Sequence, residues 1–197
     1  SGAPLVNLHQ TCAETGRHLK HMRAVTTALG LGMLGVGYQP KWARHDIPWL
    51  PKGRYQIMRD HMPKVGRFGL DMMLRSCTVP VNLDYCDEPD MRRKFRTSLA
   101  LQPVATALFA NSPFRDGKPS GLLSTRAEAW TDTDNARCGV PACVFDAGFG
   151  YQQWIDYILD VPMYFLHRGE DYIDVAGQSF RDYLASRLAG FEGMPPN

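Results

Sequence analysis

The chain has 197 residues and a mass of 22.1 kDa, a size typical of one globular domain or of part of a larger one. Its composition, 44% apolar and 21% charged, excludes a disordered or collagen-like chain. A formal net charge of +2, with Lys and Arg scattered along the sequence, argues against nucleic acid as a partner, and the apolar runs are too short for a membrane span.

Apolar residues spaced by three and four positions predict an amphipathic helix over residues 5–29, with Gly30 as its stop. Residues 33–38 are typical of a short strand whose glycines allow another backbone to come close. Residues 40–64 are rich in Pro, Trp and basic side chains. We expect a shaped surface loop there, around one short helix at residues 55–62.

Residues 74–85 form the best strand candidate because apolar and polar residues alternate. Such a strand belongs to a sheet with one face on the core and the other on a water-filled cavity. The apolar face would carry Cys77, Val79, Val81 and Leu83, and the polar face Thr78, Pro80, Asn82 and Asp84.

The next helix is predicted over residues 88–110, with Pro89 in its first turn and a kink or a split at Pro103. Residues 111–148 are polar and rich in turn-forming residues. A further helix follows at residues 151–159.

The C-terminal part predicts a hairpin of two strands, residues 163–167 and 172–175, around the turn Arg168-Gly169. A final helix over residues 179–188 has Ser179 as its natural N-cap. Strands and helices do not alternate regularly along the chain. We therefore expect an α+β fold, an antiparallel sheet with flanking helices.

The chain carries an odd number of cysteines in a domain large enough to fold without disulfides, which favours a reducing setting and a cytoplasmic location. No phosphate-binding glycine motif is present, and no two pairs of ligands stand at zinc spacing. The five cysteines are Cys12, Cys77, Cys86, Cys138 and Cys143.

Cationic and amide side chains next to predicted loops are the main candidates for a ligand site, because arginine forks suit carboxylate and phosphate oxygens. For any single one, a solvated surface charge is the plain alternative. Arg75 and Asn82 are favoured by their place on the polar strand face. The full set is Lys52, Arg54, Arg75, Asn82, Lys118 and Arg126.

The segment Ala-Asn-Ser-Pro-Phe at residues 110–114, the Ser-x-Arg pattern at residues 124–126 and Trp130 resemble the signature of carboxylate–amine ligases related to glutamine synthetase. Further segments resemble one branch of them, the glutamate–cysteine ligases of plants and proteobacteria, in order along the whole chain. Among them are Gln39-Pro40-Lys41-Trp42, Leu70-Asp71-Met72-Met73-Leu74-Arg75, Val81-Asn82-Leu83-Asp84, Trp130-Thr131-Asp132-Thr133-Asp134 and Asp160-Val161-Pro162-Met163-Tyr164-Phe165.

This resemblance implies a glutamine-synthetase-like ligase fold and an ATP-dependent reaction, the first step of glutathione biosynthesis. The γ-carboxylate of glutamate takes the γ-phosphoryl group of ATP, and the amine of cysteine attacks the resulting acyl phosphate. Such chemistry needs Mg²⁺ and fixed cations around the transferred group. The implied substrates are glutamate, cysteine and ATP, with ATP and Mg²⁺ as cofactors.

The resemblance also implies roles for individual residues. Arg126 would contact the nucleotide phosphates or the acyl phosphate, Arg75 and Asn82 would hold glutamate, and Trp130 would form a pocket wall. Met73 is a further substrate contact, and the metal ligands are not identified. Lys52, Arg54 and Lys118 are expected, with Arg126, on the nucleotide.

Residues 1–197 match the central part of the family's longer chain, without its N-terminal strands and C-terminal region. We therefore expect little or no ligase activity from this chain alone, and self-association through exposed sheet edges. Two alternatives stay open: another carboxylate–amine ligase of the same superfamily, and a non-catalytic nucleotide-binding fragment.

Three positions depart from the family's pattern: Pro80, Val175 and Ala189. Pro80 replaces a glutamine, which removes a backbone donor and a polar side chain from the predicted strand. The hairpin disulfide of the plant enzymes would fall at Val175 and Ala189, so it cannot form. Cys12 matches another redox cysteine of those enzymes, and we expect it simply to pack within its helix.

Overall fold

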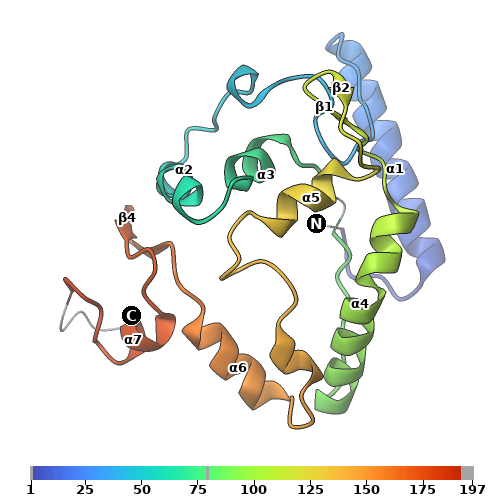
Figure 1. Cartoon of the computed structure of the whole chain (residues 1–197). Helices are drawn as coiled ribbons and strands as arrows, with labels where there is room; N and C mark the ends of the chain where they lie inside the picture. The colour runs from blue at the N-terminus through green and yellow to red at the C-terminus, as the bar shows by residue number, and fades with distance from the viewer. Residues whose placement is uncertain (1, 79, 192–197) are drawn as a thin grey trace. The chain divides into compact units, whose positions relative to one another are not determined.

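The computed structural model describes residues 2–78 and 80–191 and divides into two compact units, Ser1–Gly35 and Val36–Asn197. The first unit is built on helix α1 (Leu8–Ala28), which confirms the helix predicted from the apolar spacing (Figure 1). It begins after Asn7, because the Asn7 side chain accepts a hydrogen bond from the Gln10 amide (3.0 Å). Cys12 is exposed on this helix, so the expectation that it packs is wrong.

The second unit combines helices with two small antiparallel hairpins (Figure 1). The hairpins are β1 (Phe114–Arg115) with β2 (Lys118–Pro119), and β3 (Phe165–Arg168) with β4 (Asp171–Asp174). The helices are α2 (Gly53–Val65), α3 (Gly69–Arg75), α4 (Glu88–Leu108), α5 (Thr125–Thr131), α6 (Tyr151–Asp160) and α7 (Phe180–Leu184), with 3₁₀ turns η1 (Arg44–Asp46) and η2 (Ala142–Phe145).

This mixture of helices and small antiparallel sheets is consistent with the α+β class, but the strand predicted over residues 74–85 is wrong. Its first two residues close helix α3, and the rest of its described residues lie outside any strand; Val79 lies outside the described residues. Val81 and Leu83 are largely exposed. Alternation produces a strand only where neighbouring strands supply hydrogen bonds and a core to cover one face.

The strand predicted over residues 33–38 is also wrong, apart from one contact. Tyr38 forms an isolated antiparallel bridge with Ser76. The amide of Gln39 donates to the carbonyl of Arg75 (2.8 Å), and the amide of Cys77 donates to the carbonyl of Gly37 (2.9 Å). We call these two paired segments, residues 37–39 and 75–77, the bridge ladder.

Helix α4 confirms the prediction for residues 88–110 within two residues, but it runs through Pro103 without a split. A proline removes only one backbone donor, so the helix can continue on both sides of it, as α4 does around Pro103. Helix α2 is longer than the predicted residues 55–62 and also contains a proline, Pro63.

The C-terminal elements follow the predictions closely. Helix α6 and the β3–β4 hairpin form, although Arg168, predicted in the turn, is the last residue of β3 and pairs with Asp171. The Ser179 side chain caps α7 by accepting from the Asp182 amide (3.1 Å). Helix α7 ends four residues early, at Leu184, because the chain then turns through Ser186, whose φ is +53°. This turn buries Leu188 against Leu166.

Most of the buried apolar residues in the described part of the chain form two small clusters rather than one core. One joins the β3–β4 hairpin to α7 through Leu166, Val175, Tyr183 and Leu188. The other joins α4 to η2 through Met91, Val144 and Phe149.

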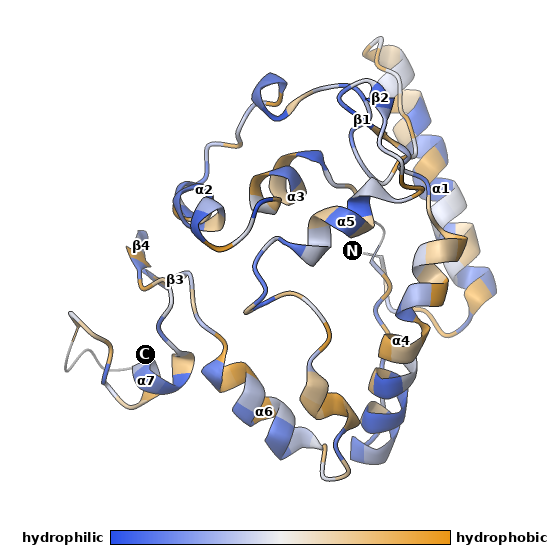
Figure 2. Cartoon of the chain, in the orientation of Figure 1, coloured by the Kyte–Doolittle hydropathy of each residue, from blue (hydrophilic) through white to orange (hydrophobic). Residues whose placement is uncertain are grey.

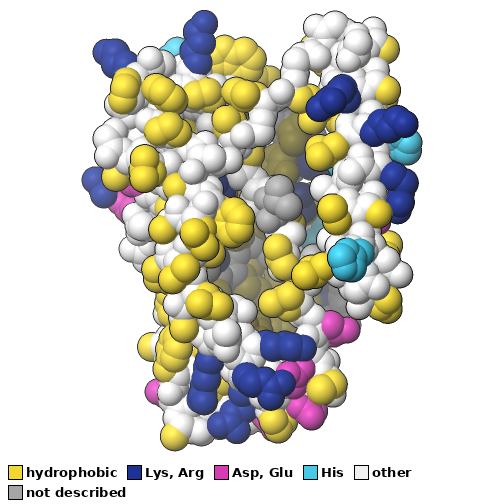
Figure 3. All heavy atoms as spheres, turned by 90° about the vertical axis from the view of Figure 1, so that its right-hand side faces the viewer, with side chains coloured by type: hydrophobic (Ala, Val, Ile, Leu, Met, Phe, Trp, Pro, Cys, Tyr) yellow, Lys and Arg dark blue, Asp and Glu magenta, His cyan; other side chains and the backbone are white. Residues whose placement is uncertain are grey.

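Many hydrophobic side chains stay on the surface (Figure 3), and Figure 2 shows that hydrophobic residues occur along the helices, α4 among them. On α4 the side chains of Leu101, Val104 and Leu108, spaced by three and four residues, are all more than half exposed. None of the helices in the described ranges is both long and apolar enough to cross a membrane. Self-association through sheet edges stays a prediction.

Candidate ligand-binding site

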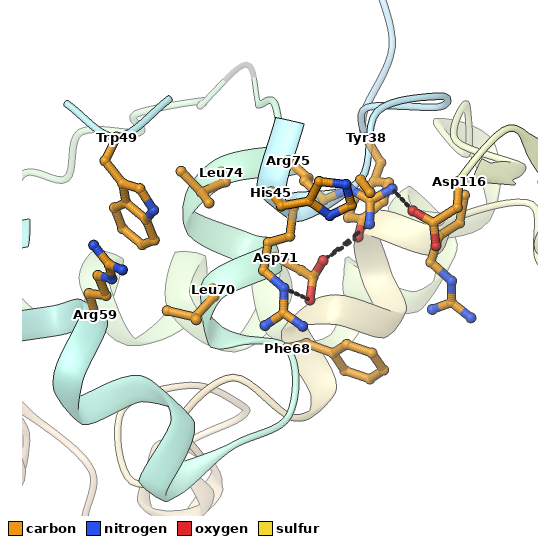
Figure 4. Close-up of a pocket in the computed structure, with 13 residues that line it drawn as sticks. Tyr38, His45, Trp49, Arg59, Phe68, Leu70, Asp71, Leu74, Arg75 and Asp116 are labelled. Carbon is orange, nitrogen blue, oxygen red and sulfur yellow. Dashed lines mark hydrogen bonds and ion pairs between the residues drawn. The ribbon is translucent and has the colours of Figure 1, made fainter. Parts of the chain in front are cut away.

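The bridge ladder holds Arg75 in a buried network of charges. Asp71, one helical turn earlier on α3, lies 3.2 Å from Arg75 (Oδ1 to Nη1). Asp116, in the turn between β1 and β2, lies 2.8 Å from Arg75 (Oδ1 to Nη2), as Figure 4 shows. The Tyr38 ring lies against the guanidinium, 4.7 Å from its centre. Arg75 is only 4% exposed, so these contacts replace water around its charge.

Tyr38 and Arg44 complete the network around Asp71. The Tyr38 hydroxyl donates to Asp71 Oδ1 (3.2 Å), and Arg44 Nε lies 3.7 Å from Asp71 Oδ2. Burial and the neighbouring Asp71 carboxylate raise the pKa of Tyr38 to about 12, so its hydroxyl remains a donor at neutral pH.

A cavity of about 620 Å³ lies beside this network, between η1, α2, α3 and the β1–β2 turn. In Figure 4, Trp49 and Arg59 stand at one end, Leu70 and Leu74 lie between, and Asp71 with Arg75 forms the other end. Its lining residues are Tyr38, Ala43, Arg44, His45, Trp49, Arg59, Phe68, Leu70, Asp71, Leu74, Arg75, Arg115 and Asp116.

Arg126 is held at the end of the same bridge ladder. It is the second residue of α5, and its Nε donates to the carbonyl of Cys77 (2.8 Å) while its amide donates to Ser112 Oγ (3.2 Å). Its guanidinium lies 5.9 Å from the centre of the Trp130 ring. Gly37 lets Arg126 and Ser112 come close to the ladder, since a Cβ at that position would lie 3.4 Å from Arg126 Cδ and 3.5 Å from Ser112 Oγ.

The other predicted site residues are not gathered at this ladder. Asn82 is exposed and outside any strand, so the polar strand face expected to pair it with Arg75 does not exist. Met73 is half-buried on α3 and does not line the cavity, and Lys118 is exposed on β2. Lys52 lines a smaller hollow of about 230 Å³, which shares Trp49 and Arg59 with the main cavity. Arg54 lies over the ring of Tyr55 and lowers the pKa of that hydroxyl.

Sequence reasoning missed most of the charged residues around Arg75. Asp71 and Arg75 stand at the i, i+4 spacing of a helical ion pair, a signal that the strand prediction for residues 74–85 concealed. Arg44 and Asp116 come from distant parts of the chain, and no local pattern connects them to Arg75.

A second buried carboxylate, Asp134, also binds an arginine and a tyrosine. It accepts from the Tyr164 hydroxyl (2.9 Å) and from Arg137, and His61 Nε2 lies 3.8 Å away. Arg137 donates in addition to the carbonyls of Pro162 (2.6 Å) and Met163 (2.8 Å). Burial, then Arg137, lowers the pKa of His61, while burial and Asp134 raise the pKa of Tyr164.

Among the residues that the structure describes, no group of three or more His, Cys, Asp or Glu side chains is placed to hold a metal ion. Mg²⁺ prefers an octahedral set of oxygen ligands, usually with carboxylates among them. The carboxylates nearest the cavity, Asp71 and Asp116, are already bound to guanidinium groups. The described residues therefore do not fit a magnesium site.

Comparison with known proteins matches residues 1–188 to the model of glutamate-cysteine ligase family 2 (GCS2). The chain is 60% identical over its full length to glutamate–cysteine ligase B, chloroplastic, of Oryza sativa subsp. japonica, and to glutamate–cysteine ligase, chloroplastic, of Arabidopsis thaliana. It is 61% identical to the chloroplastic ligase of Nicotiana tabacum. It spans 40% of the rice protein and 38% of each of the other two.

The cytoplasmic location expected from the sequence is wrong, because these relatives are all named as chloroplastic. The expectation rested on free cysteines. Free thiols indicate a setting in which they stay reduced, and that property does not distinguish one reducing compartment from another.

Proposed function

Since this chain belongs to glutamate-cysteine ligase family 2, we propose that it contributes part of an active site that joins glutamate to cysteine at the expense of ATP. We place residues 1–197 in the central portion of one catalytic domain with a glutamine-synthetase-like fold. The names of the relatives support the two amino-acid substrates and a plastid location.

One observation carries this proposal: the bridge ladder includes Arg75, and the side chain of Arg126 donates to the carbonyl of Cys77 in the same ladder. Acyl phosphate formation concentrates negative charge on the transferred group, and fixed guanidinium groups stabilise it without reorganising. Arg126 is assigned to that charge. Arg75 is assigned to a glutamate carboxylate, which would replace Asp116, since the Asp116 side chain is 54% exposed.

The remaining assignments rest on the resemblance of their motifs. Trp130 forms a wall beside Arg126, and Asn82 and Met73 are substrate contacts. Lys52, Arg54 and Lys118 are assigned, with Arg126, to the nucleotide. Mg²⁺ would neutralise the phosphates, and no step is derived through it because the described residues do not fit a magnesium site.

Titration calorimetry of the chain with ATP, glutamate and cysteine tests the proposal. Binding of all three supports a ligase. Binding of ATP alone would instead make the chain a non-catalytic nucleotide-binding fragment, and binding of a different amine in place of cysteine would indicate another carboxylate–amine ligase. Failure to bind any of the three would overturn the proposal.

Replacing Arg126 tests the catalytic assignment. In the full gene product, Arg126→Ala is expected to lower turnover by about 10²-fold, as loss of an electrostatic stabiliser does. The matched control is Arg187→Ala, which removes an exposed arginine that pairs only loosely with Asp182 (3.5 Å). An unchanged rate in Arg126→Ala would leave Arg126 with the structural role that its bond to Cys77 shows.

A further inference from the structure

The guanidinium of Arg126 is bound to its own chain at one nitrogen and keeps two for a ligand. Its Nε donates to the carbonyl of Cys77 (2.8 Å), whereas the two Nη nitrogens form no hydrogen bond or ion pair with the residues that the structure describes. The two Nη groups lie in one plane and form a fork that suits a pair of anion oxygens. The direction of this fork depends on what holds Arg126 at its base.

Ser112 holds the backbone of Arg126 at the start of α5. Ser112 Oγ accepts from the Arg126 amide (3.2 Å), and the Ser112 carbonyl accepts from the amide of Thr125 (2.9 Å). The amide of Ser112 donates to the carbonyl of Leu123 (3.1 Å), and Ser112 forms a parallel bridge with Ser124. Ser112 is only 3% exposed, so water cannot readily replace its hydroxyl as the acceptor.

A second anchor holds the side chain of Arg126. The Cys77 carbonyl that accepts from Arg126 Nε belongs to the bridge ladder, where the Cys77 amide donates to the carbonyl of Gly37 (2.9 Å). Ser112 lies next to this ladder, since a Cβ at Gly37 would lie 3.5 Å from Ser112 Oγ. Arg126 is therefore fixed at its amide by one segment and at Nε by another, and the loss of either anchor would change the direction of the Nη fork.

We propose that Ser112 is a positioning residue, which fixes Arg126 so that the Nη fork meets the charge that develops on the transferred phosphoryl group. The inference rests on the proposed function, since Ser112 acts only through the role assigned there to Arg126. Charged groups that are aligned in advance lower a reaction barrier, and a misplacement of about 1 Å can cost about 10²-fold in rate. Ser112 belongs to the Ala-Asn-Ser-Pro-Phe segment, so this role also gives a physical reason for a serine at that place in the motif.

A double-mutant cycle in the full gene product separates positioning from folding. Ser112→Ala is expected to lower kcat by about tenfold, because Arg126 loses one of its two anchors. In the Arg126→Ala background, the same substitution is expected to change kcat by less than about twofold, because the residue through which Ser112 acts is gone. A loss of folded protein would instead lower kcat by the same factor in both backgrounds.

Ser112→Thr keeps the hydroxyl and is expected to retain most of the turnover. The matched control is Ser179→Ala, which removes a hydroxyl that accepts from the Asp182 amide (3.1 Å) at the start of α7 and should leave kcat unchanged. The inference is overturned if Ser112→Ala leaves kcat unchanged, or lowers it equally in both backgrounds, and the ligase proposal then survives. If Arg126→Ala itself leaves kcat unchanged, the inference and the catalytic assignment of Arg126 fail together.

Discussion

Asp71 and Asp134 occupy matching positions in two regions of the molecule. Each is buried, each accepts a hydrogen bond from a tyrosine hydroxyl, and each pairs with an arginine about one helical turn further along the chain. The surroundings differ. Arg137 also donates to two backbone carbonyls. By contrast, Arg75 Nε has no hydrogen-bond partner among the described residues, and Arg75 lines a cavity.

The comparison separates a structural ion pair from a candidate site. Around Asp134 the donors and acceptors are matched, and the network ties α2 to the start of β3 through His61 and Tyr164. Around Asp71, one donor without a partner among the described residues, Arg75 Nε, and an open cavity remain. Residue types alone do not distinguish the two, because the same three kinds of side chain build both.

The largest loss of stability is expected in the network around Asp134. Asp134→Ala leaves Arg137 buried without its carboxylate and should lower the free energy of unfolding by about 3–5 kcal/mol, measured by urea denaturation. Asp132→Ala is the matched control and should cost far less, because its partner Arg67 is 80% exposed. Equal losses in the two variants would contradict the structural role of Asp134.

Asp71→Ala should destabilise the chain less, by about 1–3 kcal/mol, because Arg75 retains Asp116 and the cavity admits water. The same urea titration measures it. A loss as large as that of Asp134→Ala would remove the difference between the two regions.

His61 should make stability depend on pH. Its pKa is lowered below the ordinary 6.5 in the folded chain, so the unfolded chain binds the proton more readily and stability falls as pH drops through that value. We expect His61→Gln to lose less stability than the unmodified chain between about pH 7.5 and about pH 5.5, by thermal unfolding. An identical pH dependence of stability in the unmodified chain and in His61→Gln would contradict the lowered pKa of His61.

The smallest effect, a change in ligand affinity, is expected at Asp116, which lines the cavity beside Arg75. Asp116→Asn removes a negative charge beside Arg75 and should raise the affinity for glutamate, whose carboxylate is assigned to Arg75, by about threefold at low salt, with a smaller gain at high salt. Calorimetry at two ionic strengths measures it. A lower affinity would show that Asp116 positions Arg75 for the ligand rather than competing with it.

Local signals predicted much of the secondary structure. The helix at residues 8–28, the cap at Ser179 and the β3–β4 hairpin depend on residues close together in the chain, and they form as expected. The strand predicted at residues 74–85 does not form, because a strand depends on distant neighbours for its hydrogen bonds. Among the described residues of this segment, a single bridge pairs Ser76 with Tyr38.

The candidate site was predictable only in part. Arg75 and Arg126 were identified from their motifs, and the side chain of Arg126 binds the carbonyl of Cys77, two residues after Arg75 in the bridge ladder. Arg75 was nevertheless expected on the face of a sheet, and it closes a helix instead. Trp49 and Arg59 carried no local signal for the cavity, because side chains from separate elements form it.

The order of residues alone determined the family, the positions of most helices and the arginines available for binding an anion. Only the tertiary structure decided that the partners of Asp134 are matched and that Asp71 lines a cavity. Hydrogen bonds and burial depend on distances between elements far apart in the chain, and no spacing along the sequence specifies those distances.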